Sequence, residues 1–210
     1  MSNSSFTYEQ ASQFTEHLQG PSGSAPDKPI ARVPGQAAMW FFVVGDLWIF
    51  TCYFACYAYD RAQEPMAFLQ GQLSLSQDLG AFNTVLLLTS SLLVALCLKA
   101  TRKQQHTQAR QLLLMGGTLG VCFLLIKAAE WYVKIEAGLP VMSGQFFIYY
   151  FMFTGLHFMH VSLGLVILTL VYLELKKATA GNLAMVEAGA VYWHMVDLLW
   201  IIIFALLYLM

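Results

Sequence analysis

The chain has 210 residues, of which 58% are hydrophobic and 11% are charged, and its formal net charge is −1. Soluble domains carry about 25% charged residues, so this composition excludes an ordinary soluble protein and a basic nucleic-acid-binding protein. It predicts an all-α, polytopic integral membrane protein.

The chain divides into a polar amino-terminal part and five apolar segments. Residues 1–35 are rich in Ser, Gly, Pro and Gln, and we expect them to form a polar, flexible cytoplasmic tail. Each later segment holds roughly the 20 apolar residues that a membrane span needs. These segments are residues 36–59, 79–100, 111–133, 145–173 and 187–210. Short polar loops, the longest expected at 60–78, favour a five-transmembrane-helix antiparallel bundle over residues 36–210.

Lysine and arginine residues fall mostly on one side of this bundle. Eight of the eleven lie in the tail and in the loops after the second and fourth spans, and two, Arg61 and Lys134, lie on the other side. Cytoplasmic loops carry the excess of basic residues. The sequence therefore predicts a cytoplasmic amino terminus and a periplasmic carboxyl terminus.

Five ionisable residues lie near the middle of the predicted spans: Asp46, His157, His160, His194 and Asp197. Ionisable groups at that depth are costly and indicate function or specific packing by default. Asp46 and Asp197 are each ten residues into a span, about 15 Å from its start at 1.5 Å per residue. The shared depth predicts one buried intramembrane polar network, in which a carboxylate is neutral or hydrogen-bonded because desolvation disfavours its charged form.

Two further spacings predict contacts on the third span. Lys127 and Glu130 are three residues apart, so they share one helix face and are expected to form an ion pair. Gly116 and Gly120 form a Gly-x-x-x-Gly pattern, which favours close helix packing. The four cysteines form no Cys-x-x-Cys pair and are interpreted as small apolar side chains.

Several functions are compatible with these residues alone. Interhelical hydrogen bonding is the commoner role of a single intramembrane His or Asp. A stand-alone proton or small-solute transporter using Asp46 and Asp197 is the alternative. A haem with two axial histidines would use His157 or His160 with His194, and a di-metal site would need Glu-x-x-His pairs that the sequence lacks. We predict no catalytic, cofactor-binding or metal-binding residue in this chain.

Five blocks of the sequence occur in the same order in a known family. They read MWFFVVGDLWIF (39–50), NTVLLLTSS (83–91), KAAEWY (127–132), FTGLHFMHVSLG (153–164) and YWHMVDLLW (192–200). With these blocks, residues 36–210 resemble subunit III of the haem-copper respiratory oxidases (cytochrome c oxidase subunit III). The resemblance is strongest to the short, five-helix, NorE-like branch of that family.

The resemblance implies an accessory subunit without redox centres of its own. Such a subunit packs on the catalytic subunit I, which carries haem and copper, or on the catalytic subunit of a nitric oxide reductase. It is expected to sit in a bacterial inner membrane, to bind phospholipid and to support proton uptake. Polar positions of the family are matched by Glu130, His157, His160, His194 and Asp197.

Asp46 matches a position where many family members carry an intramembrane glutamate. The resemblance implies that Asp46, His160 and Trp48 contact lipid. Longer members have seven helices, and their first two form one wall of a lipid-filled cleft. A cleft of that design would need a partner to supply the wall here.

Overall fold

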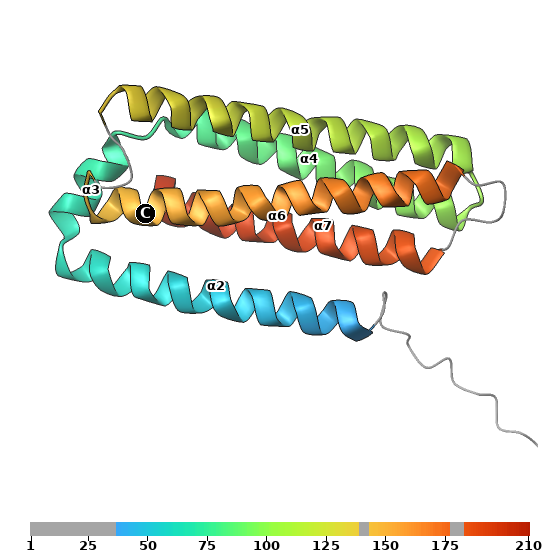
Figure 1. Ribbon diagram of the computed structural model, residues 1–210, viewed down its shortest axis with the longest axis horizontal. Coiled ribbons are helices and arrows are strands. Elements are labelled where there is room, and N and C mark those ends of the chain that lie inside the picture. Colours follow the sequence, from blue (N-terminus) through green and yellow to red (C-terminus); the bar gives the residue numbers. More distant parts are fainter. Residues whose placement is uncertain (1–36, 139–142, 177–182) are drawn as a thin grey trace, which may run out of the picture. The chain divides into compact units, whose positions relative to one another are not determined.

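The computed structural model (Figure 1) describes residues 37–138, 143–176 and 183–210. Its elements are α2 (Ala37–Gln63), α3 (Pro65–Leu73), α4 (Gln77–Arg102), α5 (His106–Glu136), α6 (Gln145–Lys176), α7 (Leu183–Phe204) and the π-helix η1 (Ala205–Leu209). The predicted tail, residues 1–35, lies outside the described residues.

Five of the described helices are long and apolar enough to cross a membrane. They are Met39–Gln63, Gln77–Arg102, His106–Glu136, Gln145–Lys176 and Leu183–Leu209. The predicted all-α fold with five spans is therefore confirmed for the described part of the chain. The helices extend past most predicted ends, because Gln, Lys and Arg continue a helix well although they end the apolar run from which a span is predicted.

The segment predicted as the loop 60–78 is largely helical, so that part of the prediction is wrong. α2 continues into it and α3 follows directly, with Pro65 in its first turn, where a missing N–H costs nothing. Phe68 of α3 is 1% exposed and lies 5.5 Å from the ring of Tyr57. Nine residues are too few to show a clear apolar period, and the helix is stabilised by contacts that only the folded chain provides.

Helices α4, α5, α6 and α7 lie side by side as an antiparallel bundle (Figure 1). Ser90 of α4 donates to the carbonyl of Gly116 on α5 at 2.8 Å. Trp200 of α7 donates to the hydroxyl of Thr84 on α4 at 3.0 Å. On each helix, the residues that face the interior recur every three or four positions and so form one stripe along the helix. On α6 this buried stripe includes Tyr150, Phe153, His157, Val161, Gly164 and Leu168.

Helix α2 contacts the bundle mainly through aromatic side chains. Phe54 lies 5.2 Å from the ring of Phe153 on α6, and Phe42 lies 6.1 Å from the ring of Tyr192 on α7. The opposite side of α2 is open, and Phe41 and Trp48 are 82% and 71% exposed. α2 is thus apolar on all sides, as a span bordering lipid or a partner helix must be.

The chain of α7 ends in the π-helix η1, whose carbonyls accept bonds from other helices. The hydroxyl of Tyr57 on α2 donates to the carbonyl of Leu206 at 3.0 Å, and the side-chain amide of Gln77 on α4 donates to that of Tyr208 at 2.9 Å. π-Helical turns leave backbone groups available in this way. This end of the bundle is therefore fixed by side chains of α2 and α4.

Candidate functional site

The polar residues of the spans form several separate groups. The group with the most hydrogen bonds surrounds Lys127. We use "the Lys127 cage" for Lys127 and Glu130 of α5, Tyr150 of α6 and Tyr208 of η1. Nζ of Lys127 lies 3.0 Å from Oε2 of Glu130. It also donates to the hydroxyls of Tyr208 and Tyr150, at 2.8 and 3.4 Å. The hydroxyl of Tyr150 in turn donates to Oε1 of Glu130 at 2.8 Å, and that of Tyr208 donates to the same oxygen at 2.9 Å.

The cage satisfies the groups that it buries. An ammonium has three N–H donors, and each of those of Lys127 meets an oxygen. The side chains of Lys127 and Glu130 are 0% and 3% exposed, so removing one would leave the other charged and unpaired in the interior. Lys127 also lies over the ring of Trp200, 5.2 Å from its centroid. The cage thus joins α5, α6 and both parts of the last span.

Asp46 and His160 connect α2 to α6. Oδ1 of Asp46 lies 3.1 Å from Nε2 of His160, and Nδ1 of His160 lies 2.7 Å from the carbonyl of Leu156. The ring of Phe50 packs edge-on against the imidazole, 5.6 Å between centroids. Both side chains are largely covered, at 12% and 17% exposure. Of the five residues predicted to form one network, these two are brought together.

The geometry of this pair defines how many protons it holds. A carbonyl oxygen only accepts, so Nδ1 of His160 carries a proton toward Leu156. The contact between Nε2 and Asp46 then needs one further proton, carried either by the imidazole or by the carboxyl group. Asp46 and His160 therefore share one proton inside the span.

Asp197 and His194 do not bond to each other. His194 is exposed, and its Nδ1 lies 2.5 Å from the hydroxyl of Ser91 on α4. Asp197 is buried at 4% exposure, and within the described residues neither of its carboxyl oxygens has a hydrogen-bond partner. The described part of the chain consequently offers no hydrogen-bonded route from Asp197 to Asp46.

His157 occupies an aromatic setting of its own. It is fully buried, with its ring 5.6 Å from that of Phe123 and 5.0 Å from that of Trp200. Among the described residues, neither ring nitrogen has a hydrogen-bond partner. The buried amide of Asn83 on α4 is equally unpartnered there. His157 thus packs as a ring, and among the described residues it has no hydrogen bond to the Asp46–His160 pair.

The three residues expected to contact lipid do not lie together. Asp46 and His160 contact each other, whereas Trp48 is 71% exposed on α2. Residues 46 and 48 are two apart on one helix, so they point to different sides. The exposed indole suits a lipid or a partner surface, while the pair serves the contact between two helices.

The histidines of the spans do not fit a haem held by two axial ligands. Each has a different neighbour: a carboxylate for His160, a hydroxyl for His194 and two aromatic rings for His157. Within the described residues, no group of three or more His, Cys, Asp or Glu side chains is placed to hold a metal ion. All four cysteines lie in described helices as free thiols.

Sequence reasoning missed several members of these sites. Tyr150 and Tyr208 complete the Lys127 cage, although no spacing or motif in the sequence indicates either tyrosine. Asn83 and Ser91 carried a signal, because a polar residue in an apolar span needs a partner. No signal in the sequence assigned His194 as the partner of Ser91, since His194 comes from another helix. Among the described residues Asn83 has no hydrogen-bond partner.

Comparison with known proteins identifies the same family that the five sequence blocks resemble. Residues 33–210 match the family described as cytochrome c oxidase subunit III. The chain is similar to the heme-copper oxidase subunit I+III of Aeropyrum pernix, at 29% identity over 93% of this chain and 25% of that protein. It is similar to cytochrome bo(3) ubiquinol oxidase subunit 3 of Buchnera aphidicola, at 25% identity over 94% of this chain and 96% of that protein. A third relative, cytochrome c oxidase subunit 3 of Alkalihalophilus pseudofirmus, is 27% identical over 81% of this chain and 84% of its own length.

Proposed function

Because this chain belongs to the cytochrome c oxidase subunit III family, we propose that it is the accessory, non-catalytic subunit of a haem-copper respiratory enzyme. The family match over residues 33–210 carries this proposal. The chain spans about a quarter of the Aeropyrum pernix relative, whose name joins subunit I and subunit III in one protein. It spans nearly the full length of the separate Buchnera subunit. We infer that it associates with a subunit I that supplies the haem and copper.

The Lys127 cage supports a structural role for this chain and not a catalytic one. The Lys127 cage is closed, with the ammonium and the carboxylate of Glu130 both bonded. Such a buried pair fixes helix positions when all of its members are satisfied. We propose that this chain stabilises the catalytic subunit by offering it a rigid membrane surface.

We also propose that this chain supports proton uptake by the complex and contacts phospholipid. Asp46 and His160 share one proton within a span, which suits a site that supports proton uptake by the complex. Exposed Trp48 on α2 suits contact with phospholipid. The relatives include subunits of a ubiquinol oxidase and of a cytochrome c oxidase. Ubiquinol and cytochrome c should therefore both be tested as electron donors to the complex. A nitric oxide reductase of the kind associated with the NorE-like branch is a further candidate partner.

We also propose a bacterial inner membrane with a cytoplasmic amino terminus. Eight lysines and arginines lie on the side of the tail and two on the other. Cysteine-substituted variants tested with a membrane-impermeant maleimide would check this. Labelling of a cysteine at Gln104 in intact cells would contradict the orientation, because that loop belongs to the basic side.

Copurification tests the main proposal. The tagged chain, extracted from its own membranes in a mild detergent, is expected to bring down a second subunit with the optical spectrum of haem and with bound copper. The chain purified alone should show no haem absorption. Recovery of a lone, haem-free chain from those membranes would contradict the proposal, and proton transport by that lone chain in liposomes, lost in Asp46→Asn, would support the transporter alternative.

A further inference from the structure

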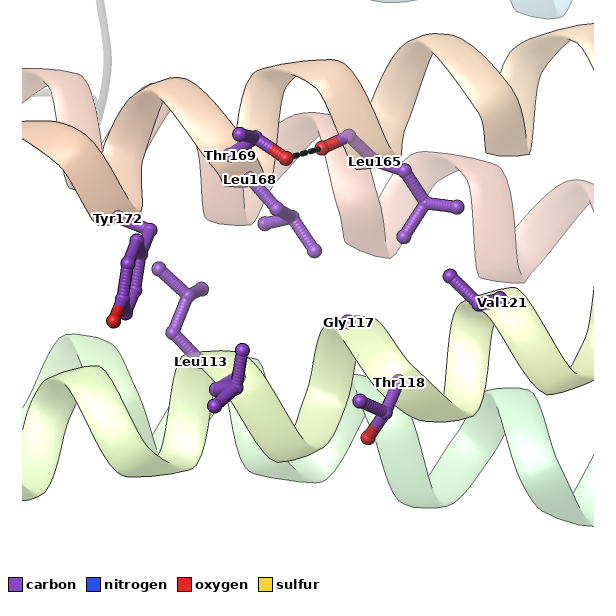
Figure 2. Close-up of a pocket in the computed structure, with 9 residues that line it drawn as sticks. Leu113, Gly117, Thr118, Val121, Leu165, Leu168, Thr169 and Tyr172 are labelled. Atoms are coloured by element: carbon purple, nitrogen blue, oxygen red, sulfur yellow. Dashed lines mark hydrogen bonds between the residues drawn. The ribbon is translucent and has the colours of Figure 1, made fainter.

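An apolar groove runs between α5 and α6 (Figure 2). Its volume is about 270 Å³, and its lining includes Leu113, Gly117 and Val121 of α5 with Leu165, Leu168 and Tyr172 of α6. Val121 is 44% exposed, so the groove opens on the outer side of the helices. Figure 2 shows Tyr172 at one end, with its ring extending from α6 toward α5.

Gly117 leaves the middle of this groove open. A Cβ built on Gly117 would meet nothing within 4 Å, whereas one on the adjacent Gly116 would lie 3.3 Å from the backbone oxygen of Ser90. Packing within this chain therefore requires a small residue at position 116 and leaves position 117 free. The space beside Gly117 is available to another molecule.

Two basic residues, Arg110 of α5 and Lys176 of α6, flank the lining residues at the end of the groove near Tyr172. Arg110 precedes Gly117 by seven residues, two helical turns, and thus lies on the same side of α5. Its Nε is buried and has no hydrogen-bond partner among the described residues. On α6, Nζ of Lys176 lies over the ring of Tyr172, 5.9 Å from its centroid. Long basic side chains at a helix end reach toward the headgroup region of a bilayer.

We propose that this groove binds an anionic phospholipid, with one acyl chain beside Gly117 and the phosphate at Arg110. From Val121 to Arg110 the groove rises about 16 Å at 1.5 Å per residue, close to half of a hydrocarbon core roughly 30 Å thick. A guanidinium can donate two parallel bonds to a phosphate, and the terminal nitrogens of Arg110 would be the donors here. The site is separate from Asp46, His160 and Trp48 and does not rest on the proposed function.

Native mass spectrometry of the full-length chain, delipidated in detergent, tests the proposal. The probes are phosphatidylglycerol and phosphatidylcholine with identical acyl chains. We expect one tightly retained lipid, with phosphatidylglycerol favoured by about fivefold, since a basic residue near an anionic headgroup contributes about 1 kcal/mol. Equal retention of the two lipids by the unchanged chain would overturn the proposal.

Two substitutions separate the acyl and phosphate contacts. Gly117→Leu fills the groove and should reduce retention of both lipids at least fivefold. Arg110→Gln should lower phosphatidylglycerol retention more than phosphatidylcholine retention and so remove the preference, because both lipids lose a phosphate contact but only phosphatidylglycerol carries a net negative charge. Val121→Trp fills the same groove from another position and replaces Gly117→Leu if that variant loses helical content.

Matched controls lie elsewhere in the bundle, on α6 and α4. Gly155 of α6 is also partly buried with nothing within 4 Å of a built Cβ, so Gly155→Leu should bind lipid as the unchanged chain does. Arg102 is paired with Glu187 at 2.8 Å, and Arg102→Gln should keep the lipid preference. If Gly117→Leu and Val121→Trp retain lipid normally but lose the catalytic partner, the groove holds a protein helix and the proposal is wrong.

Discussion

Trp193 occupies the space that a side chain at Gly120 would need. A Cβ built on Gly120 would lie 2.8 Å from Cη2 of Trp193, and one on Gly164 would lie 2.9 Å from the other side of the same ring system. The indole N–H donates to Ser90 at 3.1 Å. One tryptophan of α7 therefore contacts α4, α5 and α6, and the two glycines make room for it.

Gly120→Ala should destabilise the protein by about 1–3 kcal/mol, because the added methyl group overpacks the ring of Trp193. Gly117→Ala is the control, since a Cβ there meets nothing, and alanine is the better helix former by up to about 1 kcal/mol. Unfolding of both variants in mixed detergent micelles, followed by circular dichroism, measures the difference. Equal stability of the two variants would show that the indole moves aside.

Lys127→Met should cost about 3–5 kcal/mol, because it leaves the carboxylate of Glu130 buried without its cation. The double variant Lys127→Met with Glu130→Leu should recover part of this loss, since no unpaired charge is left. Lys103, exposed in the loop after α4, provides the control Lys103→Met. If the double variant loses the sum of the two single losses, the cage is not a coupled unit.

Asp46 and His160 should be energetically coupled through their shared proton. We expect Asp46→Leu and His160→Leu to be non-additive, with a coupling free energy of about 0.5–3 kcal/mol in a double-mutant cycle. The measurement is the unfolding free energy of the four proteins in one detergent. Strict additivity would mean that the 3.1 Å contact contributes nothing to holding α2 against α6.

His157→Phe should be tolerated, within about 1.5 kcal/mol, because the ring contacts to Phe123 and Trp200 are kept. His157→Ala removes those contacts and should cost about 3–5 kcal/mol, as other aromatic-to-alanine changes in cores do. Thermal unfolding of the two variants compares them directly. A phenylalanine variant as unstable as the alanine variant would show that the ring nitrogens bind something essential.

His194→Ala should lower the amount of haem partner that copurifies, by about fivefold or more for a contact worth over 1 kcal/mol. His194 is exposed in the middle of α7, where an ionisable group facing lipid is costly and a partner surface is the better environment. The unfolding free energy of the isolated chain should change little. Unchanged copurification would place the partner on another face.

The sequence alone determined the fold class, the five spans and the family. These follow from local properties, since about 20 apolar residues define a span wherever its neighbours lie, and since the blocks that match the family are continuous in the chain. The helical period also placed Lys127 and Glu130 on one face, and in the structure these side chains lie 3.0 Å apart. The short helix α3 was missed because its stability comes from contacts of Phe68 with α2.

Only the tertiary structure decided which polar groups meet. Depth along a span placed Asp46, His157, His160, His194 and Asp197 near one another, but depth does not define the rotation of each helix about its axis. In the folded chain that rotation pairs Asp46 with His160, turns His194 outward and encloses His157 between rings. Side-chain contacts between helices depend on angles and neighbours that no single helix encodes, so one predicted network became several separate sites.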